Sequence, residues 1–247
     1  MKIESYKKKT SNIYEITLSN NEKISLYDDV ILKYELLIKK EIDDQLKEKI
    51  YEENSYLECY YKAVKYLNTK LRTEKEIRKK LADYNNKIVD YTIRRLYDEG
   101  YINNSMYIKA YINDEVNFKL IGPNKILKDL MQKGYKNEEV TNYLDTIDKC
   151  IWDNKINKYI SKKIQSNHKL SGQILKQKIY QDLLLKGFEK QSINNNIEDF
   201  EFDDDKAIYE KEYSKIKNKL SKKYSNDELI YRINIELRKK GFKKDLD

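Results

Sequence analysis

The chain has 247 residues, of which 39% are hydrophobic and 37% are charged, and its formal net charge is +8. No window approaches the eighteen or so apolar residues of a membrane span, and the high charge favours a thin, surface-rich architecture over one thick core. With 6 glycines and 1 proline, the sequence has few residues to separate many strands, so helices should predominate. The positive charge favours an anionic partner, nucleic acid first.

The first forty or so residues differ from the rest. Short runs rich in β-branched residues and tyrosine cover Lys2–Lys8, Ile13–Leu18 and Lys23–Leu26, and Ser, Thr and Asn residues separate them. Such alternation of short runs and turn residues predicts a small β-meander. A short helix should follow from Asp28. A unit of this size needs support, so we expect it to pack on the first helices that follow.

Helical periodicity dominates after the meander. Apolar residues at three- and four-residue steps predict a helix over about 55–70. A second helix should begin at Thr73, which forms a capping-box pattern with Glu76. The third helix is predicted over about 87–99 and should end at Gly100.

The same order of three helices then returns along the chain. Pro123 suits the first position of a helix, where its missing N–H costs nothing. The acidic segment 198–205 is typical of a connector, and Ser225 with Glu228 forms another capping-box pattern. The later helices are predicted over residues 105–118, 123–133 and 137–149, within 152–200, and over 206–222 and 226–240.

Three glycine-aromatic pairs mark the repeat most clearly, and they recur about every fifty residues. Each pair follows the same apolar stripe, with isoleucine and leucine at constant offsets before the glycine. Glycine suits the left-handed residue that closes a helix, and the aromatic can fold back onto the last turn. The pairs are Gly134-Tyr135, Gly187-Phe188 and Gly241-Phe242, preceded by Ile126 and Leu130, Ile179 and Leu183, and Ile233 and Leu237.

These patterns predict a mostly α fold, in which tandem three-helix repeats form an elongated, curved array with a small N-terminal β-meander. The predicted parts are a β-rich subdomain with a linking helix over 1–53, three-helix repeats over 54–102, 103–149 and 150–202, and a partial repeat over 203–247.

Catalytic and cofactor motifs do not stand out. His168 is the single histidine, no Ser, Cys or Asp motif adjoins it, and Gly-rich phosphate loops are missing. Cys59 and Cys150 lie far apart in helical patterns, which favours reduced thiols over a disulfide or zinc site. We therefore expect a protein that is not an enzyme, without cofactor or metal, in the cytoplasm.

Several short motifs resemble one known family in their order and separation, most specifically over about 55–144. The junction 98–104, followed by Tyr107, Ala110 and Tyr111, is similar to that between the family's first two repeats, although Asn103-Asn104 replaces the more usual acidic residues. Tyr66-Leu67, Leu71-Arg72-Thr73, Glu76-Ile77 and Lys80-Leu81 resemble the first-repeat signature of RecX, and Gly122-Pro123, Lys125-Ile126, Asp129-Leu130 and Lys133-Gly134-Tyr135 resemble the second. The meander and the extra C-terminal helices resemble longer members from Gram-positive bacteria.

The resemblance implies a non-enzymatic regulator of the RecA recombinase. Members of the RecX family are curved arrays of three-helix units that bind in the groove of the RecA filament on single-stranded DNA. They limit its ATP hydrolysis, strand exchange and persistence. An array that enters such a groove would act as a monomer.

The contact residues must be inferred from helix faces, because the family offers no compact catalytic motif to transfer. Cations that flank inward-facing apolar residues are the candidates, with arginines favoured for their bidentate pairing to carboxylate or phosphate. An equally weighted interpretation makes them solvated faces or local salt bridges to Glu74, Glu76 and Asp129. The candidates are Lys70, Arg72, Arg78, Lys79, Arg94, Arg95, Lys119, Lys125 and Lys128.

Three functional hypotheses follow. The first is a modulator of the RecA filament, and the second is a protein of repeated helical units that binds DNA directly, without RecA. The third, an enzyme whose site assembles from distant carboxylates, has no anchor in the sequence.

Overall fold

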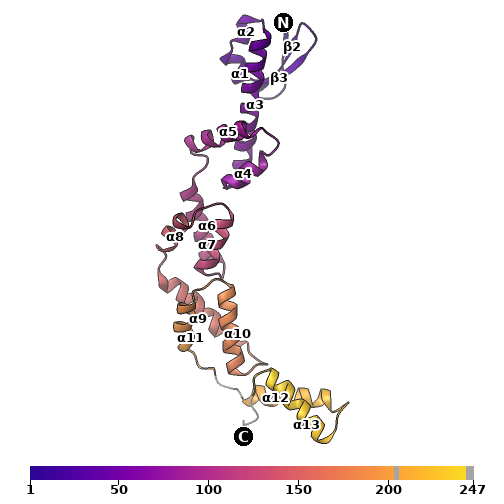
Figure 1. Cartoon of the computed structure of the whole chain (residues 1–247), viewed down its shortest axis with the longest axis vertical. Coiled ribbons are helices and arrows are strands. Elements are labelled where there is room, and N and C mark those ends of the chain that lie inside the picture. The colour runs from indigo at the N-terminus through magenta and orange to yellow at the C-terminus, as the bar shows by residue number, and fades with distance from the viewer. Residues whose placement is uncertain (203–205, 243–247) are drawn as a thin grey trace. The chain divides into compact units, whose positions relative to one another are not determined.

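The computed structural model describes residues 1–202 and 206–242. The chain divides into two compact units, Met1–Tyr107 and Ile108–Asp247. Helices make up most of the described residues, and the strands all lie near the N-terminus (Figure 1). The predicted mostly α fold with a small N-terminal sheet is confirmed. The acidic segment predicted as a connector extends through residues 203–205, which lie outside the described part of the chain.

The N-terminal sheet is the predicted meander. Strands β1 (Ile3–Lys8), β2 (Ile13–Leu18) and β3 (Lys23–Tyr27) pair antiparallel in the order β1-β2-β3. The side chain of Asn54 covers the free edge of β3, since it accepts from the amide of Tyr27 at 3.0 Å and donates to the carbonyl of Ser25. Such cover protects an edge from pairing with another chain.

One long helix joins the sheet to the first three-helix unit. After the short helices α1 (Asp28–Lys33) and α2 (Leu36–Lys39), α3 runs over Asp44–Leu67 without a break. The apolar periodicity of the sequence predicted that this helix begins near residue 55, which is wrong, because α3 begins at Asp44. The reason is that the first half buries a single isoleucine, Ile50, among charged residues, so its apolar periodicity is weak.

The first three-helix unit consists of the second half of α3 with α4 (Glu74–Lys80) and α5 (Asn86–Asp98). The predicted capping box is present, because Thr73 Oγ1 accepts from the amide of Glu76 at 3.1 Å and Glu76 accepts from the amide of Thr73 at 2.9 Å. The core of this unit includes Cys59, Tyr60, Ala63, Ile77, Leu81, Val89, Ile93, Leu96 and Ile102.

The second compact unit repeats the three-helix order. Helix α6 (Asn104–Phe118) spans the division between the compact units. The later elements are α7 (Pro123–Gln132), α8 (Asn137–Leu144), α9 (Lys149–Gln165), α10 (Gly172–Leu185), α11 (Lys190–Glu198), α12 (Lys206–Leu220) and α13 (Asn226–Lys239).

Two sequence-based details of these helices are wrong. Helix α8 ends at Leu144 instead of Lys149, because Asp148 accepts from the amide of Cys150 at 2.9 Å and so starts α9. The capping box at Ser225 does not form. Asn226 adopts a left-handed φ of 52° and the Ser225 side chain caps no amide, although its carbonyl accepts the first helical bond.

The three glycine-aromatic turns close their helices as predicted. Gly187 has a φ of 85°, its amide donates to Leu184, and the amide of Phe188 reaches back to the carbonyl of Leu183 at 3.1 Å. This is the Schellman pattern, and it recurs at the other two pairs. The aromatic residues Tyr135, Phe188 and Phe242 are buried, and so are Ile126, Leu130, Ile179, Leu183, Ile233 and Leu237.

Neighbouring repeats of the second compact unit are joined through these same turns. The amide of Gly122, at the start of α7, donates to the carbonyl of Lys186 at 2.8 Å, and the amide of Asn124 donates to Gly187 at 3.0 Å. In the next pair of repeats, the amide of Ser171 donates to the carbonyl of Lys240 at 3.0 Å. The first turn of one middle helix therefore docks on the closing turn of the next.

Candidate interaction surface

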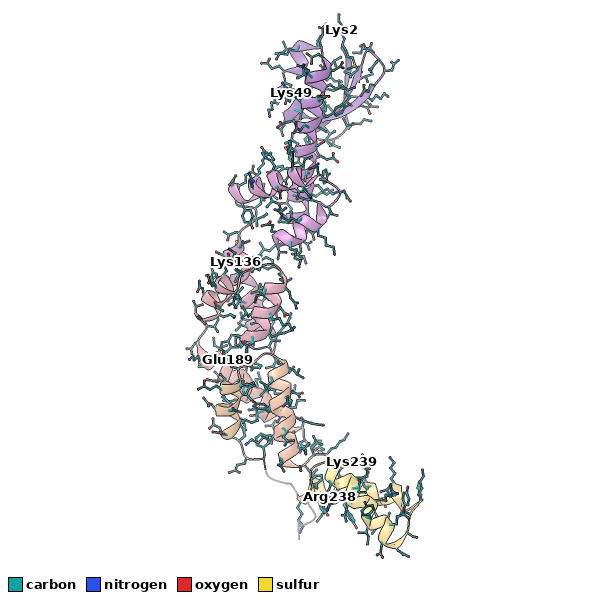
Figure 2. The ribbon with its side chains drawn as sticks, viewed as in Figure 1. Lys2, Lys49, Lys136, Glu189, Arg238 and Lys239 are labelled. Atoms are coloured by element: carbon teal, nitrogen blue, oxygen red, sulfur yellow. The ribbon has the colours of Figure 1, made fainter. Side chains whose placement is uncertain are left out.

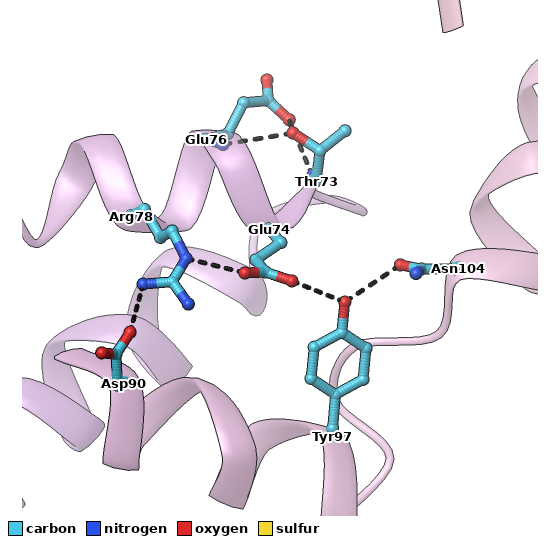
Figure 3. A network of polar contacts seen from close by, with 7 residues as sticks. All are labelled: Thr73, Glu74, Glu76, Arg78, Asp90, Tyr97 and Asn104. Carbon is cyan, nitrogen blue, oxygen red and sulfur yellow. Dashed lines mark hydrogen bonds and ion pairs between the residues drawn. The ribbon is translucent and has the colours of Figure 1, made fainter. Parts of the chain in front are cut away.

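The predicted contact cations divide into those held by partners inside a helical unit and those without an ion partner. Arg78 is held. It donates to Glu74 and to Asp90, both at 2.7 Å, and so links α4 to α5. Figure 3 shows the network continuing to the Tyr97 hydroxyl, which lies 2.9 Å from Glu74 Oε2 and 3.3 Å from Asn104 Oδ1. Arg78 thus organises its own unit.

Arg95 is held in a similar way. Its Nε donates to Glu99 at 2.7 Å, and its guanidinium carbon lies 3.9 Å from the centroid of the Tyr60 ring. The Tyr60 hydroxyl donates to the same carboxylate at 2.5 Å. The pKa of Glu99 is lowered mainly by the hydrogen bond from Tyr60 and next by the one from Arg95. The pKa of Tyr60 is raised mainly by its burial.

Two of the predicted lysines of the second compact unit also have partners. Lys119 pairs with the buried carboxylate of Glu115 at 2.6 Å, and Lys125 pairs with Asp129 at 2.9 Å. Lys155 donates to the carbonyl of Lys119, and burial lowers the pKa of Lys155. Two of the local salt bridges considered from the sequence are therefore present, Arg78 with Glu74 and Lys125 with Asp129. Glu76 instead forms the capping box with Thr73.

The remaining five predicted cations have no ion partner within the described part of the chain. They are distributed over both compact units: four lie within or beside the first three-helix unit, and the fifth lies on α7. These five are Lys70, Arg72, Lys79, Arg94 and Lys128.

An aromatic residue that the contact prediction did not include organises part of this surface. The Tyr66 ring lies 4.1 Å from the guanidinium carbon of Arg72 and 5.8 Å from the Lys80 ammonium. Arg72 also donates to Thr69 at 3.1 Å, while its Nε is buried without a hydrogen-bond partner. The sequence could have indicated this role of Tyr66, because Tyr66 belongs to the same group of short motifs as Arg72 and Lys80.

Groups typical of catalysis do not gather here. His168 is exposed near the end of α9, and no cluster of three His, Cys, Asp or Glu side chains suited to a metal occurs among the described residues. Within residues 1–202 and 206–242, no helix has both the length and the apolarity to cross a bilayer. The described surface carries cations and tyrosine rings that lie close together, as Arg72 and Tyr66 do.

Comparison with known proteins agrees with this architecture. Residues 59–96 match the family model described as RecX, first three-helix domain. A crystal structure of regulatory protein RecX superposes with a TM-score of 0.70, at 23% identity, over 81% of this chain and 100% of that one. RecX from Lactobacillus salivarius superposes with a TM-score of 0.52, at 26% identity, over 59% of this chain and 96% of that one.

The sequence relatives extend the match to nearly the whole chain. Regulatory protein RecX from Streptococcus agalactiae serotype III (strain NEM316) is 33% identical over 98% of this chain and 95% of its own length. The protein of the same name from Streptococcus mutans serotype c is 32% identical with the same coverage. The chain therefore belongs to the RecX family of regulatory proteins.

Proposed function

We propose that this chain binds the RecA filament on single-stranded DNA and lowers its ATP hydrolysis, strand exchange and persistence. The observation that carries the proposal is similarity to regulatory RecX proteins over 98% of the chain. Repeated helical units joined through backbone hydrogen bonds suit a protein that docks along another polymer. We place the protein in the cytoplasm as a monomer, with docking as its activity in place of catalysis.

Charge supports the same proposal. A filament on DNA carries phosphate groups, and the cations best able to contact them are those not already engaged by carboxylates. Lys70, Lys79 and Arg94 are exposed and lack an ion partner in the described structure. They are the contacts we assign in the first three-helix unit, with Lys128 in the second compact unit. Arg78 and Arg95 instead hold their unit together.

Reversing the free cations should weaken inhibition of RecA without unfolding the protein. The triple variant Lys70→Glu, Lys79→Glu, Arg94→Glu changes exposed side chains only, so circular dichroism and melting should stay close to those of the parent. We expect the parent, at substoichiometric amounts, to depress ATP turnover by RecA on single-stranded DNA. The variant should need about tenfold more protein for the same effect, since three like-charge contacts replace attractive ones.

The matched control carries the same change of charge elsewhere. Lys49→Glu, Lys65→Glu and Lys87→Glu also alter exposed lysines without ion partners in the described structure. This control should inhibit nearly as well as the parent. Equal inhibition by both triple variants would contradict the contact assignment, and no effect of the parent at any ratio would remove the proposed function.

Direct binding to DNA without RecA is the second candidate. It is favoured by the position of Arg72 over the Tyr66 ring at 4.1 Å, because a cation beside an aromatic ring suits contact with phosphates and bases. This candidate predicts binding to bare DNA with a log-log salt slope of about −0.9 per duplex phosphate neutralised. Competition between bare DNA and the filament separates the two: preference for bare DNA would favour the second.

A further inference from the structure

A groove of about 470 Å³ opens between the end of α9 and the first half of α10, inside the second compact unit. The two helices pack against each other, and Figure 1 shows them side by side. Leu175 and Ile179 give the groove a buried apolar wall, and the turn over 166–170 contributes the rest of the lining. The groove therefore belongs to a single helical repeat.

The turn that lines the groove is held by its own hydrogen bonds. Asn167 Oδ1 accepts from the amide of Leu170 at 3.1 Å, and Asn167 Nδ2 donates to the carbonyl of the same residue at 2.8 Å. The next residue, Ser171, is bonded through its amide to the carbonyl of Lys240 at the repeat junction. The groove is thus formed before any ligand binds, which lowers the entropic cost of binding.

The charged lining of the groove is mainly positive. Lys163, Lys169 and Lys178 contribute three ammonium groups, against one carboxylate from Asp182. Lys169 and Lys178 are exposed and form no ion pair within residues 1–202 and 206–242. A cleft with charges of one sign above an apolar wall focuses its field on ligands of the opposite sign. The groove therefore has the charge of an anion receptor.

The one carboxylate of the lining is already engaged. Asp182 Oδ2 accepts from the Tyr159 hydroxyl at 2.7 Å and lies 3.8 Å from the Lys163 ammonium. These contacts direct the carboxylate toward α9. Asp182 thus offsets part of the charge of Lys163 and leaves Lys169 and Lys178 for a ligand.

Tyr159 gives a second, independent indication. Its ring lies beside the groove, with the Lys163 ammonium 5.3 Å and the Lys186 ammonium 5.7 Å from the ring centroid. Lys178 and Lys186 are eight residues apart on α10, so they share a face of the helix and are separated by about 12 Å along it. The positive surface therefore extends past the groove and has an aromatic ring within it.

This combination selects among the possible anions. A single phosphate ion would contact only part of a surface that extends from the groove to Lys186. An acidic peptide has carboxylates but lacks flat rings to lie on Tyr159. A single DNA strand supplies both, since it carries one charge on each nucleotide and its bases stack on aromatic side chains.

We propose that the groove between α9 and α10 binds the phosphate backbone of a single DNA strand, with Lys169 and Lys178 as its main contacts. This deepens the proposed function, on which it rests, because the filament is formed on such a strand. The groove gives the second compact unit a DNA site of its own, in addition to the free cations of the first unit.

The sequence has a single histidine, and His168 lines the groove, so its ring protons report binding there by NMR. We expect a short oligothymidylate, added at constant pH without RecA, to shift these resonances saturably, with a dissociation constant on the order of 10 μM at physiological salt. The variant Lys169→Gln, Lys178→Gln should bind about tenfold more weakly. Its log-log salt slope should be smaller by about 1.4, since each single-strand phosphate contact contributes about 0.7.

The matched control is Lys149→Gln, Lys190→Gln, which removes two exposed lysines outside the groove that form no ion pair in the described structure. It should bind the oligonucleotide as the parent does. The proposal would be overturned by the absence of a saturable His168 shift in the parent, by an equal shift with an oligoglutamate of the same charge, or by equal affinities of the two double variants.

The same titration separates the groove from the proposed function, because it contains no RecA. A saturable shift in a protein that fails to depress ATP turnover by RecA would support the groove and remove the proposed function. Depressed ATP turnover without any shift at His168 would remove the groove and leave the proposed function standing.

Discussion

Gly187→Ala should destabilise the second compact unit by about 3 kcal/mol, which is roughly three times the cost of Gly134→Ala. Both glycines have positive φ, 85° and 105°, so both variants carry the left-handed strain of about 1 kcal/mol. At Gly187 the new Cβ would also lie 2.4 Å from the amide nitrogen of Lys125 and 2.5 Å from its Cβ. Equilibrium unfolding in urea measures the difference.

The comparison isolates the repeat junction from backbone strain. A Cβ at Gly134 meets no heavy atom of the described residues within 4 Å. Gly122→Ala tests the junction from its other side, because Gly122 has an ordinary φ of −96° but its Cβ would lie 2.4 Å from the backbone of Gly187. Hydrogen exchange at the Gly122 and Asn124 amides should accelerate in Gly187→Ala. Equal losses at Gly187 and Gly134 would contradict the junction as described.

Lys240→Met should cost about 3 kcal/mol of the stability of the pair α12 and α13. Glu212 is 1% exposed on α12, and the Lys240 ammonium from the end of α13 donates to its carboxylate. Methionine keeps the aliphatic packing but leaves a buried carboxylate without its partner. Glu212 lies beside a small core of Ile216, Ile233, Leu237 and Phe242, so little other packing offsets the loss.

The effect should depend on pH. The hydrogen bond from Lys240 is the first cause that lowers the pKa of Glu212 in the folded state. A depressed carboxyl pKa adds stability that is complete above the unfolded value of about 4.3 and is lost as the pH falls through the folded value. When the pH is lowered from neutral to below the folded pKa of Glu212, the melting temperature of the parent should therefore fall more than that of Lys240→Met.

The neighbouring lysine supplies the control. Lys239 pairs with Glu236 at 2.5 Å, but their side chains are 64% and 42% exposed. Figure 2 labels Lys239 next to Arg238 at the end of α13. Lys239→Met should change stability by less than about 1 kcal/mol, as is usual for exposed pairs. A loss as large as that of Lys240→Met would show that general charge, and not the buried carboxylate, controls this unit.

Features controlled by neighbouring residues were predictable from the sequence. The glycine-aromatic turns, the Thr73 capping box and the short strands all depend on contacts within a few residues, and all appear in the structure. Besides the start of α3, two local predictions were wrong, the end of α8 and the cap at Ser225. The side-chain cap of Asp148 decided the first, and the left-handed backbone of Asn226 decided the second.

The candidate site was less predictable. A helical stripe indicates which cations face solvent, and the spacing of four residues made Glu74 and Asp129 possible partners of Arg78 and Lys125. The second partner of Arg78, Asp90 on α5, depends on how the helices pack. The role of Tyr66 beside Arg72 likewise depends on how the turn after α3 folds back. The assignment of the free cations as contacts stays a prediction.

The sequence by itself determined the repeated helices and the turns that close them, because the hydrogen bonds and apolar stripes concerned recur at fixed short spacings. Only the tertiary structure decided how one repeat meets the next. The bonds from Gly122 to Lys186 and from Ser171 to Lys240 join residues far apart in the chain. Such contacts leave no periodic signal, since they depend on the packing of separate helices in three dimensions.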